Sequence, residues 1–337
     1  MSFFHPQKDF DFIAIGDITT DAFIRLNDAK VNCDTEGNKC ELSLRFGDKV
    51  PYEFVEEVKA VGNSANAAVA ASRLGLRSAL VANVGDDHNG EECIATLNKN
   101  GVSSDLITVN KDKETNYHYV LWYQEERTIL IKHQEYEYKL PDIGLPRWIY
   151  LSSTAENAYD YHLEILAYLR KNPDVKFAFQ PGTFQMKMGL EKLGELYARS
   201  DIFFCNTEEA RRILNRPEEK DTVTLLKAMR DIGPNVVVIT DGPRGAYAYD
   251  GYEAYFMPPY PDEKPPYERT GAGDAFASTF TSAIALGKSL FDAFMWAPVN
   301  SMSVVQHVGA QKGLLTQEQM QRYLSQAPES YRPRKIV

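Results

Sequence analysis

A glycine-rich turn followed by an aspartate is the part of the sequence best suited to chemistry. The motif TGAGD (270–274) runs into AFASTFTSAIALG, which is typical of a buried helix that ends at Gly287. Backbone N–H groups at such a helix start, together with the helix dipole, favour a bound anion. A carboxylate in that first turn would repel a phosphate, so its best use is as a base on a hydroxyl that attacks the phosphate. The structural alternative is that Asp274 caps the helix and the glycines form a tight turn.

Two other phosphate-binding motifs are absent from the sequence. The turn after the first predicted strand, GDITTD (16–21), lacks the G-x-G-x-x-G pattern of dinucleotide-binding folds, and no G-x-x-x-x-G-K-[ST] motif occurs. The sequence therefore disfavours a Rossmann dehydrogenase and a P-loop NTPase.

Short apolar runs alternate with helical segments along the chain. The runs are 12–16, 78–85, 148–153, 175–180, 201–206 and 235–240. Most are apolar almost throughout, as strands buried on both faces of a parallel sheet are. Helices are predicted at about 64–74 and about 90–100, each followed by a glycine stop. This alternation predicts a doubly wound, mostly parallel α/β sheet flanked by helices, with a polar ligand cleft beyond the carboxyl ends of its strands.

Two segments, about 23–60 and about 115–138, interrupt this order with alternating patterns, and the second reads as a hairpin. We interpret them as a small β-sheet inserted twice into the main domain, which could act as a lid; the alternative is an ordinary edge meander. Alternation in the hairpin places Tyr117, Tyr119 and Tyr123 on one face and His118 and Trp122 on the other. The last segment, 325–337, is expected to be a loosely held tail.

Four motifs together resemble those of the ribokinase-like (PfkB) carbohydrate kinases. TGAGDAF (270–276) looks like the C-terminal signature of that family, and VGNSANAAVAASRLG with SALVANVGDDHNGE (61–75 and 78–91) looks like the N-terminal one. NTEE (206–209) is similar to the family's N-x-x-E, and TDGPRG (240–245) to its T-x-G-x-x-G. The resemblance implies a single ribokinase-like α/β domain over residues 1–337, and the family's β-lid agrees with the predicted insertions.

The resemblance assigns the chemistry to the TGAGD turn. It implies that Asp274 is the general base that removes a proton from the substrate hydroxyl. Gly271, Ala272 and Gly273 would offer N–H groups to the transferring phosphoryl, as an anion hole that stabilises the charge developing there.

The resemblance also implies a magnesium and nucleotide site. Asn206 and Glu209 would organise Mg²⁺ and its waters around the nucleotide phosphates, with Asn206 counted among the nucleotide-binding residues and Glu209 acting partly through water; the structural alternative is that they form a helix capping box. The residues expected to line the nucleotide site are Thr240, Gly242, Gly245 and Asn300. A turn into the next strand is the alternative for the first three, and helix packing is the alternative for Asn300.

The residues implied to bind substrate hydroxyls are Asp21, Gly62, Asn63 and Asn66. Asp and Asn suit a polyol because they accept from or donate to vicinal hydroxyl groups. A surface turn is the alternative for Asp21. Asn66 lies inside an alanine-rich helical segment and would need a buried partner.

The chain departs from the family pattern at several positions. Glu268-Arg269 stands where the family commonly has Asp-Thr before TGAGD, which puts activation by a monovalent cation in doubt. Gln180-Pro181 stands in place of Asp-Pro. VGNSAN (61–66) differs from the G-G-K-G-A-N of ribokinase, and Thr19 replaces its asparagine, so the substrate need not be ribose.

Composition excludes several classes of function. With 337 residues, 37 Lys+Arg and 47 Asp+Glu, the net charge is 37 − 47 = −10, which disfavours binding to a nucleic-acid backbone. The longest uncharged stretch, 293–311, contains proline and polar residues and does not read as a membrane span. No signal peptide is recognisable at the start of the sequence. We expect Cys33, Cys40, Cys93 and Cys205 to be reduced thiols and the protein to be cytoplasmic.

The sequence thus predicts an ATP- and Mg²⁺-dependent kinase that phosphorylates a hydroxymethyl group of a sugar. A nucleoside (adenosine-like) kinase of the same family is the first alternative. Aromatic residues of the hairpin could stack on a base, or could pair two lids in a homodimer. A catalytically silent sugar or nucleotide sensor is a second alternative, which the intact Asp274 disfavours.

Overall fold

The computed structural model describes residues 10–34, 40–124, 126–262 and 264–336. Its largest feature is an eleven-stranded sheet in the order β17-β16-β15-β14-β13-β12-β11-β1-β6-β7, with β8 also paired to β6. The strands of this sheet are β1 (Phe12–Ile15), β6 (Ser78–Gly85), β7 (Val102–Ser103), β8 (Ile107–Asn110), β11 (Trp148–Leu151), β12 (Lys176–Phe179), β13 (Ile202–Asn206), β14 (Val236–Thr240), β15 (Ala246–Tyr249), β16 (Ala254–Met257) and β17 (Arg334–Lys335).

The central strands are parallel, and the edge from β14 to β17 is antiparallel. The six predicted apolar runs all form strands of this sheet. Four-residue strands such as β1 and β11 are buried at every position, which is why their sequences are apolar throughout. The predicted doubly wound, mostly parallel sheet is therefore confirmed.

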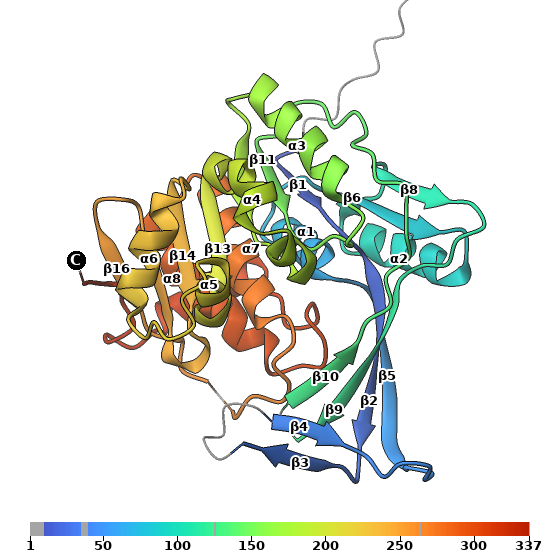
Figure 1. Cartoon of the computed structure of the whole chain (residues 1–337). Helices are drawn as coiled ribbons and strands as arrows, with labels where there is room; N and C mark the ends of the chain where they lie inside the picture. Colours follow the sequence, from blue (N-terminus) through green and yellow to red (C-terminus); the bar gives the residue numbers. More distant parts are fainter. Residues whose placement is uncertain (1–9, 35–39, 125, 263, 337) are drawn as a thin grey trace, which may run out of the picture.

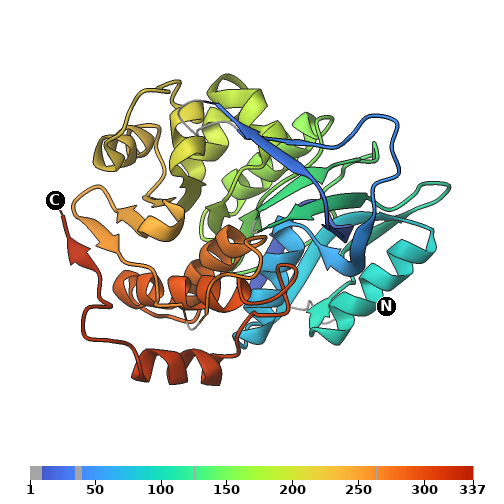
Figure 2. The same cartoon turned by 90° about the horizontal axis from the view of Figure 1, so that it is seen from below.

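Helices cover both faces of the main sheet (Figures 1 and 2). They are α1 (Asn63–Arg73), α2 (His88–Lys99), α3 (Tyr159–Lys171), α4 (Thr183–Arg199), α5 (Thr207–Ile213), α6 (Thr222–Asp231), α7 (Ala272–Ala285), α8 (Leu290–Val304) and α9 (Gln317–Ser325). One hydrophobic core joins the sheet to α1, α2, α7, α8 and α9, and a second joins its other face to α3, α4, α5 and α6. Alternate residues of each strand enter opposite cores: Phe12 and Ala14 the first, Ile13 and Ile15 the second.

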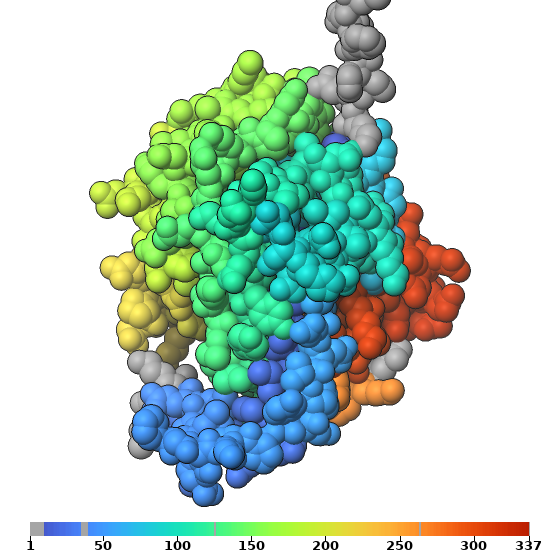
Figure 3. Space-filling model, turned by 90° about the vertical axis from the view of Figure 1, so that its right-hand side faces the viewer, coloured from blue at the N-terminus to red at the C-terminus, as the bar shows by residue number. Residues whose placement is uncertain are grey.

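A second, four-stranded sheet lies beside one edge of the main body. Its order is β10-β9-β2-β5, from β2 (Thr19–Leu26), β5 (Tyr52–Val61), β9 (Tyr117–Tyr123) and β10 (Glu126–Leu130). We call this the lid sheet; its first segment begins at Thr19 rather than near residue 23, and 131–138 form no strand. His118 and Trp122 are buried and Tyr119 is exposed, so the predicted two faces are confirmed. Figure 3 shows the blue N-terminal strands projecting from the body.

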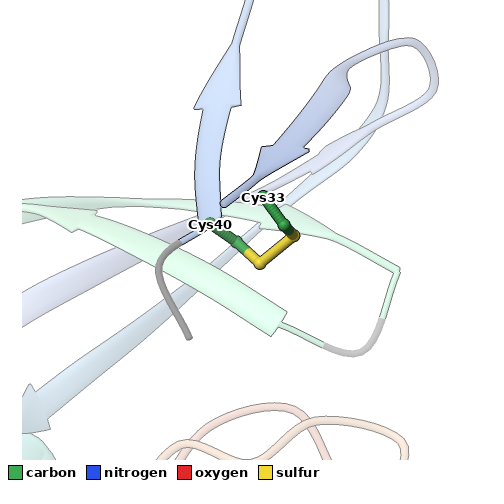
Figure 4. The surroundings of a disulfide bond; sticks show 2 residues. All are labelled: Cys33 and Cys40. Carbon is green, nitrogen blue, oxygen red and sulfur yellow. A yellow bond between two sulfur atoms is a disulfide. The ribbon is translucent and has the colours of Figure 1, made fainter. Parts of the chain in front are cut away.

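A separate two-stranded antiparallel sheet, formed by β3 (Lys30–Cys33) and β4 (Cys40–Ser43), corrects the prediction for two cysteines. Cys33 and Cys40 lie opposite each other in this sheet and form a disulfide (Figure 4). Cys93 and Cys205 are free and buried, as expected for reduced thiols. The expectation of four reduced thiols is therefore wrong for one pair, because the pairing of β3 with β4 sets these two cysteines opposite each other. The Cys33–Cys40 disulfide removes the argument for a cytoplasmic location that was based on four reduced thiols.

The C-terminal segment corrects a second expectation. Tyr331 is buried and its hydroxyl donates to the carbonyl of Met295 over 2.6 Å, and β17 pairs with β16. The segment is held by these contacts rather than loosely. Within the described residues, no helix combines the length and apolar character needed to cross a membrane.

Candidate active site

A cavity of about 450 Å³ lies at the carboxyl ends of the central strands. Residues at or just beyond the carboxyl ends of five of these strands line it: Asp17, Ser153, Gln180, Asn206 and Thr240. The lid sheet supplies the opposite wall, through side chains of β2, β9 and β10. The volume falls in the range of small-molecule sites. The polar cleft predicted from the strand ends is thus present in the structure.

Asp274 lies in the first turn of α7 and its carboxylate is held by three side-chain amides. Nδ2 of Asn63 donates to Oδ1 over 2.9 Å, and Nδ2 of Asn66 donates to Oδ2 over 2.9 Å. Nε2 of Gln180 donates to Oδ1 over 3.2 Å. Burial raises the pKa of the Asp274 carboxyl, and these hydrogen bonds oppose that rise because they favour the ionised form.

Asn66 has the buried partners that its position in a helix demands. Its Nδ2 faces Asp274, and its Oδ1 accepts from Nε2 of Gln311 over 3.0 Å. Ser64, Ala65 and the alanines around them pack α1 against the sheet and α7, which brings this asparagine to the carboxylate. Two residues predicted to contact substrate thus contact Asp274 directly in this structure.

The glycines of the TGAGD turn leave space at the start of α7. Gly271 has φ 80°, and a Cβ there would lie 2.2 Å from Cβ of Ala310, so glycine is required at this position. A Cβ on Gly273 would meet nothing within 4 Å. Both glycines line the cavity, and among the described residues no side chain caps this helix start. The backbone N–H groups of the turn, Ala272 included, are consequently available to an anion.

Asn206 and Glu209 form the predicted capping box and also line the cavity. Oδ1 of Asn206 accepts from the Glu209 amide over 2.8 Å, and Oε2 of Glu209 accepts from the Asn206 amide over 2.9 Å. Burial raises the pKa of the Glu209 carboxyl. No group of three or more acidic, His or Cys side chains able to hold a metal occurs in the part of the chain that the structure describes. A single carboxylate fits Mg²⁺ that keeps most of its water or phosphate ligands.

The residues predicted for the nucleotide divide into two groups. Thr240 lines the cavity, whereas Gly242 and Gly245 belong to the adjacent turn and do not line it. The structure also places Asn300 away from the cavity. Its fully buried amide donates to Oγ1 of Thr279 over 2.7 Å, and its Oδ1 accepts from the Leu315 amide over 2.9 Å. Asn300 therefore serves helix packing in this structure, and its predicted contact with the base stays a prediction.

Asp21 and Gly62 lie in the cavity wall. Asp21 is 7% exposed, and its Oδ1 lies 3.3 Å from Nδ1 of His118, so the surface-turn alternative is wrong. Gly62 has φ 108°, and a Cβ there would lie 2.7 Å from the carbonyl oxygen of Asp17. This close approach of two chain segments explains the glycine.

Several cavity residues were not selected by the sequence reasoning. Asp17 accepts from the Tyr138 hydroxyl over 2.7 Å, and its Oδ2 lies 3.1 Å from Nδ1 of His133. Arg127 of β10 lines the cavity, and its Nε lies 3.8 Å from Oε1 of the buried Glu268. The position of Asp17 after the first strand was a usable signal. No sequence signal pointed to His133 or Arg127, because only tertiary packing turns these side chains toward the cavity.

A buried histidine supports the loop that carries Gln180. Gln185 accepts from the Gly182 amide over 2.6 Å and donates through Nε2 to the Ser152 carbonyl over 2.7 Å. Nε2 of His162 lies 3.0 Å from the same Gln185 Nε2, and Nδ1 lies 2.6 Å from the Ala158 carbonyl. Because Nε2 of Gln185 can only donate, Nε2 of His162 must accept, and Nδ1 of a neutral imidazole carries the proton that is donated to the Ala158 carbonyl. Burial lowers the pKa of His162 to about 4.

We expect this histidine to make the fold sensitive to acid. The pKa is lower in the folded state than the ordinary 6.5, so the unfolded chain binds the proton more readily. Stability from this group is present above pH 6.5 and is lost as pH falls toward 4, by about 3 kcal/mol at 1.36 kcal/mol per pKa unit. Urea unfolding across this window should show a steeper loss for the wild type than for His162→Gln. Parallel curves would contradict the assignment.

Comparisons with solved structures identify the fold. The ribokinase of Arabidopsis thaliana, solved with ribose and ATP, superimposes with a TM-score of 0.78 at 18% identity over 94% of this chain and 99% of that one. The ribokinase of Cryptococcus neoformans, solved with ADP, gives a TM-score of 0.75 at 20% identity over 93% and 99% of the two chains. The chain therefore has the ribokinase fold.

Sequence comparison identifies the family. The profile of the pfkB family carbohydrate kinases matches residues 31–317, and the chain belongs to that family. It is 26% identical to the ribokinase of Bacillus subtilis over 78% of this chain and 87% of that protein. It is 26% identical to the 5-dehydro-2-deoxygluconokinase of Halalkalibacterium halodurans over 89% of both chains. It is 25% identical to the nucleoside kinase of Methanothermobacter thermautotrophicus over 79% and 84%. The protein is thus a kinase of the carbohydrate and nucleoside class.

Proposed function

We propose that this protein transfers the γ-phosphoryl group of ATP to a hydroxymethyl hydroxyl of a sugar, with Asp274 as the general base. The observation that carries the proposal is the position of the Asp274 carboxylate beside the open helix start of α7, within one cavity. Family relatives named as sugar kinases, and one structure named as a complex with ribose and ATP, support the choice of donor and acceptor.

In the proposed reaction the acceptor hydroxyl gives its proton to Asp274 as its oxygen forms a bond to the γ-phosphorus. The bond from that phosphorus to the oxygen bridging to the β-phosphate breaks, and ADP leaves with the electron pair. The N–H groups of Gly271, Ala272 and Gly273 stabilise the charge on the transferring phosphoryl. The lid sheet covers the acceptor and reduces the access of water, which would otherwise accept the phosphoryl.

Asn206 and Glu209 would hold Mg²⁺ with ATP, mostly through water. The ion supplies neutralisation of the phosphate charge. The capping box fixes the Glu209 side chain at the start of α5, so one carboxylate oxygen stays committed to the Asn206 amide. The other is left to act on the ion or its water.

A nucleoside acceptor is the second candidate. Phe184 lines the cavity and packs edge-on against the His133 ring at 5.6 Å between ring centroids. An aromatic ring in this wall is suited to stacking on a base. The lid tyrosines considered for that role are not among the cavity residues. Pairing of two copies through the exposed lid face stays a prediction.

An ADP-release assay tests the function. ATP and Mg²⁺ would be supplied with a panel of pentoses, hexoses, their phosphates and nucleosides. A sugar that gives turnover in the wild type but not in Asp274→Asn would support the proposal, and a nucleoside alone would select the second candidate. ATP binding without turnover on any acceptor would favour the sensor alternative.

We expect Glu209→Gln to raise the Mg²⁺ concentration needed for half-maximal activity roughly 10-fold without disturbing the fold. Glutamine can still accept from the Asn206 amide in the capping box but lacks the negative charge. Titration of activity with Mg²⁺ measures the effect. Glu208→Gln is the matched control, because this neighbouring carboxylate is exposed and pairs with Arg212. Equal responses of the two variants would argue against a metal role for Glu209.

A further inference from the structure

Gln180 is one of the positions at which the chain departs from its family, and the proposed reaction does not yet use it. It follows β12, and its amide lies between a tyrosine and the Asp274 carboxylate. Nε2 donates to Oδ1 of Asp274 over 3.2 Å. On the other side, Oε1 accepts from the hydroxyl of Tyr150, a fully buried residue of β11.

The orientation of this amide follows from the chemistry of its neighbours. An ionised carboxylate only accepts hydrogen bonds, so the NH₂ group of Gln180 must face Asp274. The oxygen then faces Tyr150, whose hydroxyl must be the donor. Tyr150 is held in the core by ring contacts with Phe12 and Phe204. A rigid tyrosine consequently fixes which side of the glutamine meets the carboxylate.

The hydrogen bonds around Asp274 are distributed unequally between its two oxygens. Oδ1 accepts from both Asn63 and Gln180, and Oδ2 accepts from Asn66. A carboxylate offers about four acceptor sites, two on each oxygen. Both sites of Oδ1 are therefore occupied, and one site of Oδ2 is left for a further donor.

We propose that Gln180, oriented by Tyr150, is a positioning residue that occupies Oδ1 of Asp274 and leaves Oδ2 to receive the proton of the acceptor hydroxyl. This inference rests on the proposed function. The neutral amide at the end of β12 donates a hydrogen bond to the carboxylate, which an ionised acidic side chain cannot do.

The surroundings of Asp274 make this arrangement testable through pH. Arg127 lies on the lid side and lowers the pKa of Asp274 by its charge, and Glu209 is the nearby acid of α5. Tyr150 stays protonated because burial raises its pKa. Gln180→Glu adds an acidic group against Asp274, so the pair holds a proton to higher pH. Gln180→Met has a similar length but can donate nothing to the carboxylate.

The experiment measures kcat and KM against pH, from about pH 5 to about pH 9, on the acceptor found in the panel. Gln180→Glu should move the acid limb of the kcat profile upward by about one pH unit or more. Gln180→Met should lower kcat roughly 10-fold, and Tyr150→Phe should lower it by less, with the KM for ATP unchanged in all three. If the wild type is active and the kcat profiles of the Gln180 variants superimpose on its profile, the positioning role of Gln180 is overturned. The proposed function would be unaffected by that result.

A second measurement needs no acceptor and covers the case of a poorly active variant. The difference in unfolding free energy between the wild type and the Asp274→Asn variant depends on pH, because burial raises the folded-state pKa of Asp274. The same difference is then measured between Gln180→Met and the double variant Gln180→Met/Asp274→Asn. Without the Gln180 donor, the pH dependence of this difference should extend to higher pH. An unchanged dependence would overturn the contact. Absence of phosphoryl transfer in the wild type would overturn the proposed function and, with it, the catalytic meaning of this contact.

Discussion

Replacing Asp274 by asparagine should lower kcat by roughly 10²–10⁴-fold while the protein still folds and binds ATP. Asparagine has the same shape but cannot take the proton of the acceptor hydroxyl. The loss should appear in kcat rather than in the affinity for ATP, because Asn206 and Thr240, the residues predicted to contact the nucleotide, are untouched. ADP release gives the rate, and calorimetric titration with ATP gives the affinity.

Asp292→Asn is the matched control for this variant. Asp292 also lies in the first turn of a helix, α8, but it is exposed and is not among the cavity residues. The same chemical change there should leave kcat unaltered. Turnover by Asp274→Asn close to that of the wild type would refute the general-base assignment. A comparable loss in Asp292→Asn would mean that the change acts through helix stability.

Alanine at the two glycines of the TGAGD turn should give separable effects. Gly273→Ala should fold normally, because its Cβ meets no neighbour within 4 Å and its φ is not positive, yet should lose roughly 10²-fold or more in kcat. The added methyl group lies where the transferring phosphoryl is proposed to bind. Gly271→Ala should lose stability as well as activity, since its methyl group would collide with Ala310 at a positive φ.

Thermal unfolding and ADP release together distinguish these cases. Gly194→Ala in α4 is the control, because its Cβ also meets nothing within 4 Å and the position is not among the cavity residues. Helix propensity predicts a small gain in stability for it and no loss of activity. Full activity in Gly273→Ala would show that the turn does not hold the phosphoryl.

Local features were predictable because residues close in sequence determine them. The capping box of Asn206 and Glu209 depends on a spacing of three residues, and the structure contains it. The apolar runs predicted buried parallel strands because each residue faces one of two helix layers. The helix after TGAGD and its glycine stop follow from the same local rules, and Gly287 has φ 82°.

Other features depended on contacts that no local pattern encodes. The disulfide requires the register that sets Cys33 opposite Cys40. Asn300 resembled a base contact in sequence, yet the packing of α7 against α8 surrounds it with partners. The C-terminal segment is polar, but Tyr331 supplies enough buried surface and one hydrogen bond to hold it.

The sequence by itself determined the element types, the order of the strand ends and the glycine turn that starts α7, because these follow from periodicity and from short-range geometry. Tertiary structure decided which donors surround the carboxylate in that turn. Asn63 and Asn66 are 211 and 208 residues from Asp274, and Gln180 is 94 residues away. These side chains meet because parallel strands end at the same edge of the sheet and α1 packs beside α7. The identity of the donor groups around the Asp274 carboxylate therefore depends on helix packing and on the register of the strands.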